Sequence, residues 1–151
     1  MKRSGPDTVG FLVGDVSRSF RRRFEAAISS AGLEVTVGES RTLFHVGLYD
    51  GIRQAALAER MSIEPMTLVN FLDRLEARGW VVRETDPSDR RAKIVKVTPA
   101  AAPLVERLQT MASEVRRQAI AGLSEREIEA VNRALERMRD NLAGSVEQAA
   151  A

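Results

Sequence analysis

The chain has 151 residues, a length that suits one ordinary folded domain with a hydrophobic core of its own. It contains no cysteine, which excludes disulfides, zinc–thiolate sites and switches that depend on thiol oxidation. The net charge is only +2, but residues 74–96 hold seven basic and four acidic side chains, so the positive excess lies in the middle of the chain.

Neither a signal peptide nor a membrane-spanning segment is expected. The first residues, MKRSGPDTVG, lack the apolar core of a signal peptide, and no apolar run approaches the ~20 residues that a spanning helix needs. We therefore expect a cytoplasmic protein.

The first predicted helix covers Thr8 to Ala31, and Gly32 can take the left-handed conformation that ends it. Its apolar side chains recur at spacings of three and four, so they fall on one helical face. They are Val9, Leu12, Val16, Phe20, Phe24 and Ile28. A second helix is expected from about Glu39 to Tyr49, because Asp50-Gly51 is a stop signal.

Two further helices are expected from Gln54 to Met61 and from Pro65 to Arg78, with Gly79 closing the second. Proline suits the first helical turn, where its missing N–H is not needed for the helix. The predicted buried face consists of Leu68, Val69, Leu72 and Leu75. Two helices joined by a tight turn of about four residues form a helix-turn-helix candidate.

A β-hairpin is predicted directly after this pair of helices. The stretches WVVRET and KIVKVT are rich in β-branched residues and alternate in polarity. Between them lies DPSD, which has proline at the second position of a type I turn. The order of helix-turn-helix and then hairpin predicts a winged helix.

From Pro99 onward the chain is predicted to be helical again, and the capping box SERE at Ser124 starts the last helix. The apolar side chains of that helix keep a regular spacing of three and four. They are Ile128, Val131, Leu135, Met138 and Leu142. A seam this regular needs a partner, and we expect both the first helix of the same chain and a second subunit to cover it.

Four short motifs link the central part of the chain to a known family. They are the run Leu72-Asp73-x-Leu75-Glu76, Gly79, the hairpin Asp86-x-x-Asp89-Arg90-Arg91 and the closing Val97-Thr98. Together they resemble the winged-helix core of the MarR family of bacterial transcription regulators, and within it the SlyA-like branch. The sequence departs from that pattern at Ala101, where glycine is frequent, and at Asn70, where the branch often has arginine.

The resemblance implies a mainly α fold, a winged helix-turn-helix of about six helices plus a β-hairpin wing, with dimerisation helices at both ends. The expected segments are an N-terminal dimerisation helix in 1–36, a DNA-binding lobe in 37–99 and C-terminal dimerisation helices in 100–151. The implied molecule is a homodimer on a pseudo-palindromic double-stranded operator. Its dimer contacts are expected from Val9, Leu12, Val16, Ile128, Val131, Leu135, Met138 and Leu142.

The helix that starts near Pro65 would enter the major groove of DNA. With its leucines turned inward, it would present Pro65, Met66, Thr67, Asn70, Phe71 and Arg74. Asn70 suits an adenine edge, Met66 a thymine methyl group, and Arg74 a guanine or a phosphate. The alternative is that these residues form an ordinary solvated helix face.

The wing is expected to contact DNA through Asp89, Arg90, Arg91 and Lys93. Exposed charges contribute little to folding stability, whereas an arginine in a narrow minor groove meets concentrated negative potential. The resemblance implies that Arg91 inserts into the groove, that Asp89 orients it, and that Arg90 and Lys93 meet phosphates. Asp89 can also be read as a turn-capping residue, which is compatible with that role.

No enzyme, cofactor or metal site is expected, because His45 has no cysteine or second histidine to complete a catalytic or metal-binding set. The resemblance does imply a small effector, aromatic or phenolic, between the dimerisation helices and the DNA-binding lobe. The candidate pocket residues are Phe20, Phe24, Arg41, His45, Tyr49 and Met111. The alternative is that the aromatic residues are core and that His45 is an ordinary helix residue.

The function expected from these observations is sequence-specific regulation of transcription, by a repressor that a small ligand releases. It would be cytoplasmic and nucleoid-associated when bound to DNA. A nonspecific architectural DNA-binding protein is the rival, and the modest net charge argues against it. A winged helix that binds protein in place of DNA is a third reading, against which Arg90 and Arg91 argue.

Overall fold

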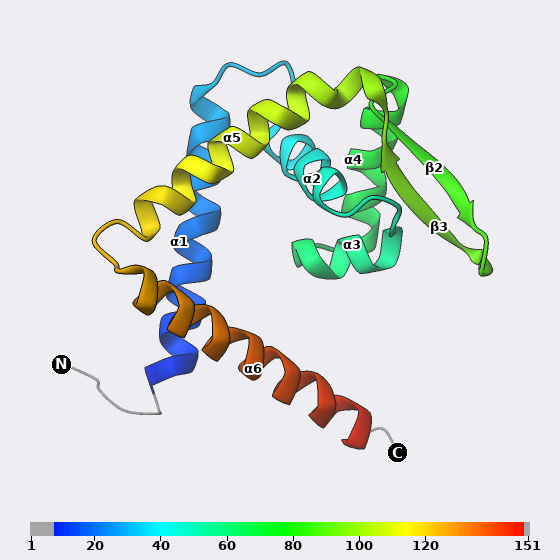
Figure 1. Ribbon diagram of the computed structural model, residues 1–151. Helices are drawn as coiled ribbons and strands as arrows, with labels where there is room; N and C mark the ends of the chain where they lie inside the picture. Colours follow the sequence, from blue (N-terminus) through cyan, green and yellow to red (C-terminus); the bar gives the residue numbers. More distant parts are fainter. Residues whose placement is uncertain (1–7, 150–151) are drawn as a thin grey trace. The chain divides into compact units, whose positions relative to one another are not determined.

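The structure is a computed structural model that describes residues 8–149, with side chains up to residue 143. The predicted terminal segments therefore lie partly outside the described residues. The elements in chain order are α1 (Val9–Ser30), α2 (Val37–Leu48), β1 (Ile52–Arg53), α3 (Gln54–Met61), α4 (Pro65–Ala77), β2 (Val81–Asp86), β3 (Asp89–Val97), a 3-10 turn (Pro99–Ala101), α5 (Ala102–Ala119) and α6 (Glu125–Ala149) (Figure 1).

The predicted winged helix-turn-helix fold is confirmed. Helices α3 and α4 are followed by the β2–β3 hairpin, beside which α2 also lies (Figure 1). Chain contacts group the described residues into two compact units, one that reaches to Val115 and one that begins at Arg116. The first unit joins α1 and most of α5 to the winged lobe.

The sheet has one strand more than the hairpin that was predicted. Strand β1 pairs antiparallel with β3, with Ile52 opposite Val95 and Arg53 opposite Ile94, and the strand order is β1-β3-β2. The alternation of polarity that reveals a strand cannot be seen in two residues. The additional strand attaches the root of the wing to the start of α3.

Helix α2 begins two residues earlier than predicted because Thr36 caps it. The Oγ1 atom of Thr36 accepts a hydrogen bond from the Glu39 backbone N–H (3.2 Å), and Oε2 of Glu39 accepts one from the Thr36 N–H (3.1 Å). This is a capping box, with threonine and glutamate three residues apart. The predicted box at Ser124 and Glu127 is confirmed, with both backbone N–H groups bonded to the opposite side chain.

The core is built from the apolar faces of the winged lobe together with that of α5, which contributes Leu108. Its fully buried members include Leu43, Val46, Leu57, Met61, Leu68, Leu72, Leu75, Val81, Val95 and Leu108. The predicted buried face of α4 is confirmed for its leucines, whereas Val69 is only half-buried. Three buried leucines on one helix fix which side of α4 faces the core.

The wing follows the predicted turn closely. Pro87 and Ser88 form the tip, and the strands pair from Val81 opposite Val97 to Thr85 opposite Lys93. An irregularity then lies between Thr85 and Asp86. Strand β3 begins at Asp89, earlier than the KIVKVT stretch suggests, so Arg90 and Arg91 lie on a strand at the end of the hairpin.

The apolar stripe of α1 changes character along the helix. Ile28 at its C-terminal end is 2% exposed and belongs to the core, and Phe24 and Phe20 are half-buried. Toward the N-terminal end, Val16 is 52% exposed and Leu12 is 58% exposed. One face of one helix is therefore core at one end and open apolar surface at the other.

Phe71 corrects one of the predictions for α4. It was expected to face outward, but it is half-buried and its ring lies over Gly38 in the first turn of α2. A Cβ atom on residue 38 would stand 2.3 Å from Cζ of Phe71, so the two helices approach this closely only because residue 38 is glycine. Phe71 therefore packs α4 against α2.

Replacing Gly38 by alanine is expected to lower the free energy of unfolding by about 1–3 kcal/mol, because the Phe71 ring must leave its place. The measurement is urea denaturation at one fixed protein concentration. Adding Phe71→Leu to the Gly38→Ala variant should recover part of the loss, since leucine lacks the ring atoms that clash. An unchanged denaturation midpoint for Gly38→Ala would show that the contact is not tight.

Candidate nucleic-acid interface

The face of α4 opposite the core is polar and exposed. Met66 is 68% exposed, and Pro65, Thr67, Asn70 and Arg74 are exposed as well. These are the residues that the sequence predicted for this face, apart from Phe71. The side chains offer an amide, a hydroxyl, a thioether and a guanidinium on one helix face, which are the groups that bind the edges of bases and phosphates.

Arg74 is exposed but not unpaired. Its Nη1 atom lies 3.4 Å from Oε1 of Glu39, and its side chain is 62% exposed whereas that of Glu39 is only 5% exposed. The second carboxylate oxygen of Glu39 belongs to the capping box of α2. The pair of Arg74 and Glu39 spans 35 residues, so no local pattern in the sequence indicates it.

Arg83 of β2 joins the wing to α4. Its Nη2 atom donates to Oδ1 of Asp73 (2.6 Å) and to Oε2 of Glu76 (2.5 Å), and its backbone N–H donates to Oε1 of Glu76 (3.2 Å). These hydrogen bonds from Arg83 hold the pKa of Glu76 below its ordinary value. The two acidic residues of the Leu-Asp-x-Leu-Glu motif thus fix the hairpin relative to α4.

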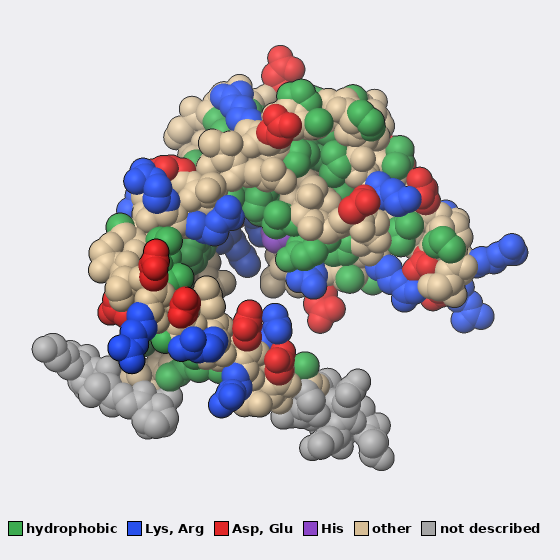
Figure 2. Space-filling view, viewed as in Figure 1, with side chains coloured by type: hydrophobic (Ala, Val, Ile, Leu, Met, Phe, Trp, Pro, Cys, Tyr) green, Lys and Arg blue, Asp and Glu red, His purple; other side chains and the backbone are tan. Residues whose placement is uncertain are grey.

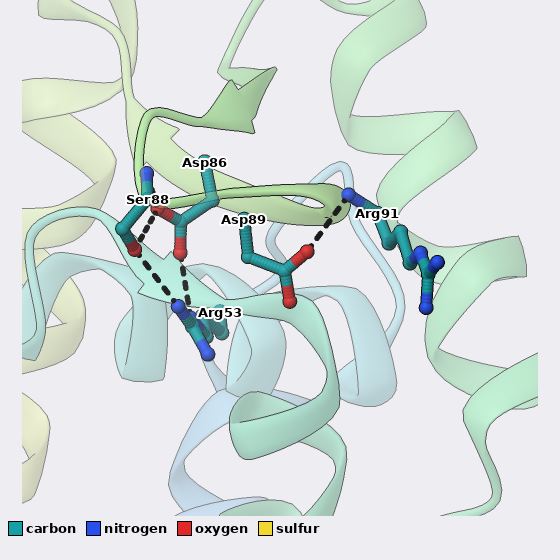
Figure 3. A network of polar contacts seen from close by, with 5 residues as sticks. All are labelled: Arg53, Asp86, Ser88, Asp89 and Arg91. Carbon is teal, nitrogen blue, oxygen red and sulfur yellow. Dashed lines mark hydrogen bonds and ion pairs between the residues drawn. The ribbon is translucent and has the colours of Figure 1, made fainter.

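The wing tip carries the predicted arginines on its surface. Arg90, Arg91 and Lys93 are exposed, and Lys and Arg side chains gather at the end of the hairpin in Figure 2. Oδ1 of Asp89 accepts a hydrogen bond from the backbone N–H of Arg91 (3.0 Å), while the Arg91 guanidinium extends away from it (Figure 3). Asp89 therefore acts on the backbone at Arg91, as a turn-capping residue does. Lys93 Nζ donates to Oγ1 of Thr85 (2.9 Å).

A second network, which sequence analysis missed, holds the turn of the wing to β1. Arg53 donates from Nε to Oδ2 of Asp86 (2.6 Å) and from Nη2 to Oγ of Ser88 (3.1 Å) (Figure 3). Both the backbone N–H and the hydroxyl of Ser88 donate to Oδ1 of Asp86. The hydrogen bonds from Ser88, followed by those from Arg53, lower the pKa of Asp86 from its ordinary 3.8 to about 2.

The predicted pocket residues come together only in part. The rings of Phe24 and Phe44 lie 4.9 Å apart, and Phe44 meets His45 edge-on at 5.6 Å. Arg41, on the preceding turn of α2, pairs with Glu25 of α1 at 3.2 Å. Phe20 and Met111 are half-buried, and Met111 packs against the core.

Tyr49 belongs to this region through Arg60, a residue that sequence analysis had not included. The Arg60 guanidinium lies 4.3 Å from the centre of the Tyr49 ring, and its Nη1 donates to the Tyr49 hydroxyl (3.2 Å). Burial and then the charges of Arg41, Arg60 and Arg21 lower the pKa of His45, so its imidazole is neutral at pH 7. Within the described residues, the buried Nδ1 atom of His45 has no hydrogen-bond partner.

Neither a metal-binding cluster nor a membrane-spanning helix is found within residues 8–143. No group of three or more His, Asp or Glu side chains is placed to hold a metal ion there. Over the same part of the chain, no helix is long and apolar enough to cross a membrane.

Comparison with known proteins gives a consistent result. The family model described as MarR family matches residues 35–93. The solved structure of transcriptional regulator PA3341 is 32% identical, with a TM-score of 0.76, over 89% of this chain and 98% of that one. Transcriptional regulator SlyA is 25% identical, with a TM-score of 0.69, over 91% of this chain and 95% of its own. SlyA is thus no more similar than PA3341, and the SlyA-like branch stays a prediction.

A MarR transcriptional regulator from Methanosarcina mazei Go1 shares the fold. It is 23% identical, with a TM-score of 0.71, over 91% of this chain and 98% of that one. The likeness extends over α1 to α6 and is not confined to the winged lobe, because it covers nine-tenths of the chain.

The low pKa of Asp86 predicts how the wing responds to acid. Because the pKa in the folded protein lies below the ordinary value, the network stabilises the wing above about pH 4 and loses this contribution as the pH falls toward 2. The Asp86 carboxyl carbon, followed by NMR, should titrate near pH 2. Ser88→Ala should raise that midpoint toward 3.8, whereas Ser113→Ala, on α5, should not. An ordinary midpoint in the parent protein would contradict the network.

Proposed function

Because the chain belongs to the MarR family of transcriptional regulators, we propose that it recognises a specific double-stranded operator through α4 and the wing. The observation that carries this proposal is the pair of exposed arginines at the end of the hairpin. Within the described residues, neither the Arg90 nor the Arg91 guanidinium makes an ion pair. Arginines that contribute nothing to the fold or its stability are suited to bind an anionic partner. A wing reaches the narrow minor groove of DNA, where the negative potential is strong.

The exposed face of α4 would supply sequence preference. Asn70 suits the two-point contact with adenine, and Met66 suits the methyl group of thymine. Thr67 lies on the same face and would bond a base or a phosphate. Two such helices in a homodimer would read half-sites about one DNA turn apart, so the operator would be pseudo-palindromic.

The proposal of a homodimer rests on the open apolar surface at both ends of the chain. On α1, Val9, Leu12 and Val16 are 37–58% exposed. On α6, Val131, Leu135 and Leu142 are 43–70% exposed, while Ile128 and Met138 are half-buried. Phe11 and Val13, which sequence analysis did not include, enlarge the exposed apolar surface of α1. Apolar surface of this extent marks an interface, and a second copy of the chain is its proposed occupant.

For the cell, we propose a cytoplasmic repressor that leaves DNA when an aromatic carboxylate or a phenol binds. A ligand of this class suits the region around His45, because Arg41 and Arg60 provide positive charge and the Phe24–Phe44 pair provides apolar surface. The neutral imidazole offers an acceptor to a phenolic hydroxyl. A coupling of ~1–3 kcal/mol between ligand and DNA would change DNA affinity roughly 5- to 150-fold, which is enough to switch a promoter.

Arg91→Ala is expected to weaken binding to the operator by ~1–3 kcal/mol, because the minor-groove contact is lost, and to leave dimerisation unchanged. Fluorescence anisotropy on an operator duplex measures the first effect, and analytical ultracentrifugation measures the second. Arg126→Ala, at the start of α6 and outside the winged lobe, is the matched control. Equal affinity of Arg91→Ala and the parent protein would remove the wing from the proposed interface.

Benzoate is expected to displace the protein from an operator duplex, and benzyl alcohol, which has a similar ring without the charge, is expected to be ineffective. Arg60→Gln should abolish the response to benzoate, because the guanidinium beside Tyr49 is lost. Arg116→Gln, on α5, serves as the control for a general loss of charge. Equal displacement of Arg60→Gln and the parent would place the effector elsewhere, and no displacement by benzoate would reject aromatic carboxylates as the effector.

A further inference from the structure

Helices α2 and α4 meet at two successive contacts. Phe71 lies over Gly38, and three residues further along α4 the guanidinium of Arg74 lies beside the carboxylate of Glu39. Residues three apart on a helix occupy neighbouring places on its surface. Helix α4 therefore packs against the first turn of α2. Glu39 is the only charged residue of that turn.

Glu39 is held in place independently of Arg74. Its Oε2 accepts the Thr36 N–H and its own N–H donates to Thr36 Oγ1, so the capping box sets the direction of the carboxylate. The side chain is 5% exposed. A carboxylate with so little contact with water depends on its cation, because an unpaired buried charge is strongly unfavourable.

Arg74 is the exposed member of the pair. Its side chain is 62% exposed, and a single contact of 3.4 Å, at the long end of hydrogen-bond geometry, joins it to Glu39. The remaining guanidinium N–H groups are free to turn toward DNA. Any movement of Arg74 onto DNA, however, separates it from a carboxylate that cannot follow.

We propose that Glu39 sets the specificity of DNA binding by restraining Arg74, an inference that rests on the proposed role of α4 as the recognition helix. A loosely placed phosphate on unrelated DNA does not compensate for the broken ion pair, so Arg74 stays with Glu39. At the operator a well-aligned contact, such as the two-point bond to guanine, does compensate. Glu39 is thus a positioning residue that acts through Arg74 and does not itself touch DNA.

Glu39→Gln is the variant that tests this restraint. Glutamine keeps an oxygen for the Thr36 N–H, so the cap of α2 is retained while the charge is removed. The probes are a duplex that the parent protein selects from a randomised pool and an unrelated duplex of equal length. On the unrelated duplex, the dependence of log affinity on log salt should steepen by about 0.9 per protomer, because Arg74 now reaches a phosphate. The ratio of selected to unrelated affinity should fall several-fold.

Arg74→Gln provides a second, independent arm. In this variant the salt dependence on unrelated DNA should stay as in the parent, whereas affinity for the selected duplex should fall. Adding Glu39→Gln to Arg74→Gln should then change nothing further. If Glu39→Gln acted only by removing negative charge near DNA, its effect would persist in the double variant, and that result would overturn the proposal. An equal loss of salt dependence on both duplexes in Arg74→Gln would also overturn it.

Thermal denaturation of each variant checks that the fold is intact. If the parent protein selects no sequence at all, the proposed specific function fails, but the salt dependence on unrelated DNA still tests the restraint. If the parent selects a sequence and Glu39→Gln leaves both salt dependence and affinity ratio unchanged, the restraint alone fails. The two failures are therefore distinguishable.

Discussion

The complete burial of Leu68, Leu72 and Leu75 decides which face of α4 points to solvent, and the rest of the candidate nucleic-acid interface depends on this orientation. Truncating any one of these leucines to alanine costs about 2–5 kcal/mol in a typical core, a large part of the stability of a small domain. With that face fixed inward, the amide of Asn70 and its polar neighbours can only face outward. The same burial brings α4 against α2, where Gly38 admits the Phe71 ring. The sequence preference proposed for α4 is thus a consequence of core packing.

Charged side chains of this chain set geometry more than stability. Arg83 joins β2 to Asp73 and Glu76 of α4, and Arg53 joins β1 to the turn of the wing. Exposed ion pairs contribute little to the free energy of unfolding, but the Arg83 pairs fix the wing relative to α4 and the Arg53 pair fixes its turn relative to β1. The wing is therefore attached at its root and at its turn, while the guanidinium groups of Arg90 and Arg91 stay outside both networks.

Local patterns in the sequence were sufficient for the helix-turn-helix, the hairpin and the capping box at Ser124, because each depends on residues a few positions apart. Strand β1 was missed because two residues show no period. Phe71 was placed wrongly because periodicity gives the direction of a side chain and not the neighbour, Gly38, that receives it. The pairs of Arg53 with Asp86 and of Arg74 with Glu39 span 33 and 35 residues, a distance over which no local pattern reports contact.

The stripe of α1, buried at Ile28 and open at Leu12, links the winged lobe to the proposed dimer, since a homodimer would carry two lobes onto one operator. The most direct test of this account is fluorescence anisotropy of the parent protein on DNA from upstream of its own gene, at stated salt and with excess unrelated DNA. The account predicts tight binding that survives the competitor and saturates at two protomers per site. Binding that the competitor abolishes on this DNA, and on any duplex selected from a randomised pool, would contradict it and favour a nonspecific architectural protein.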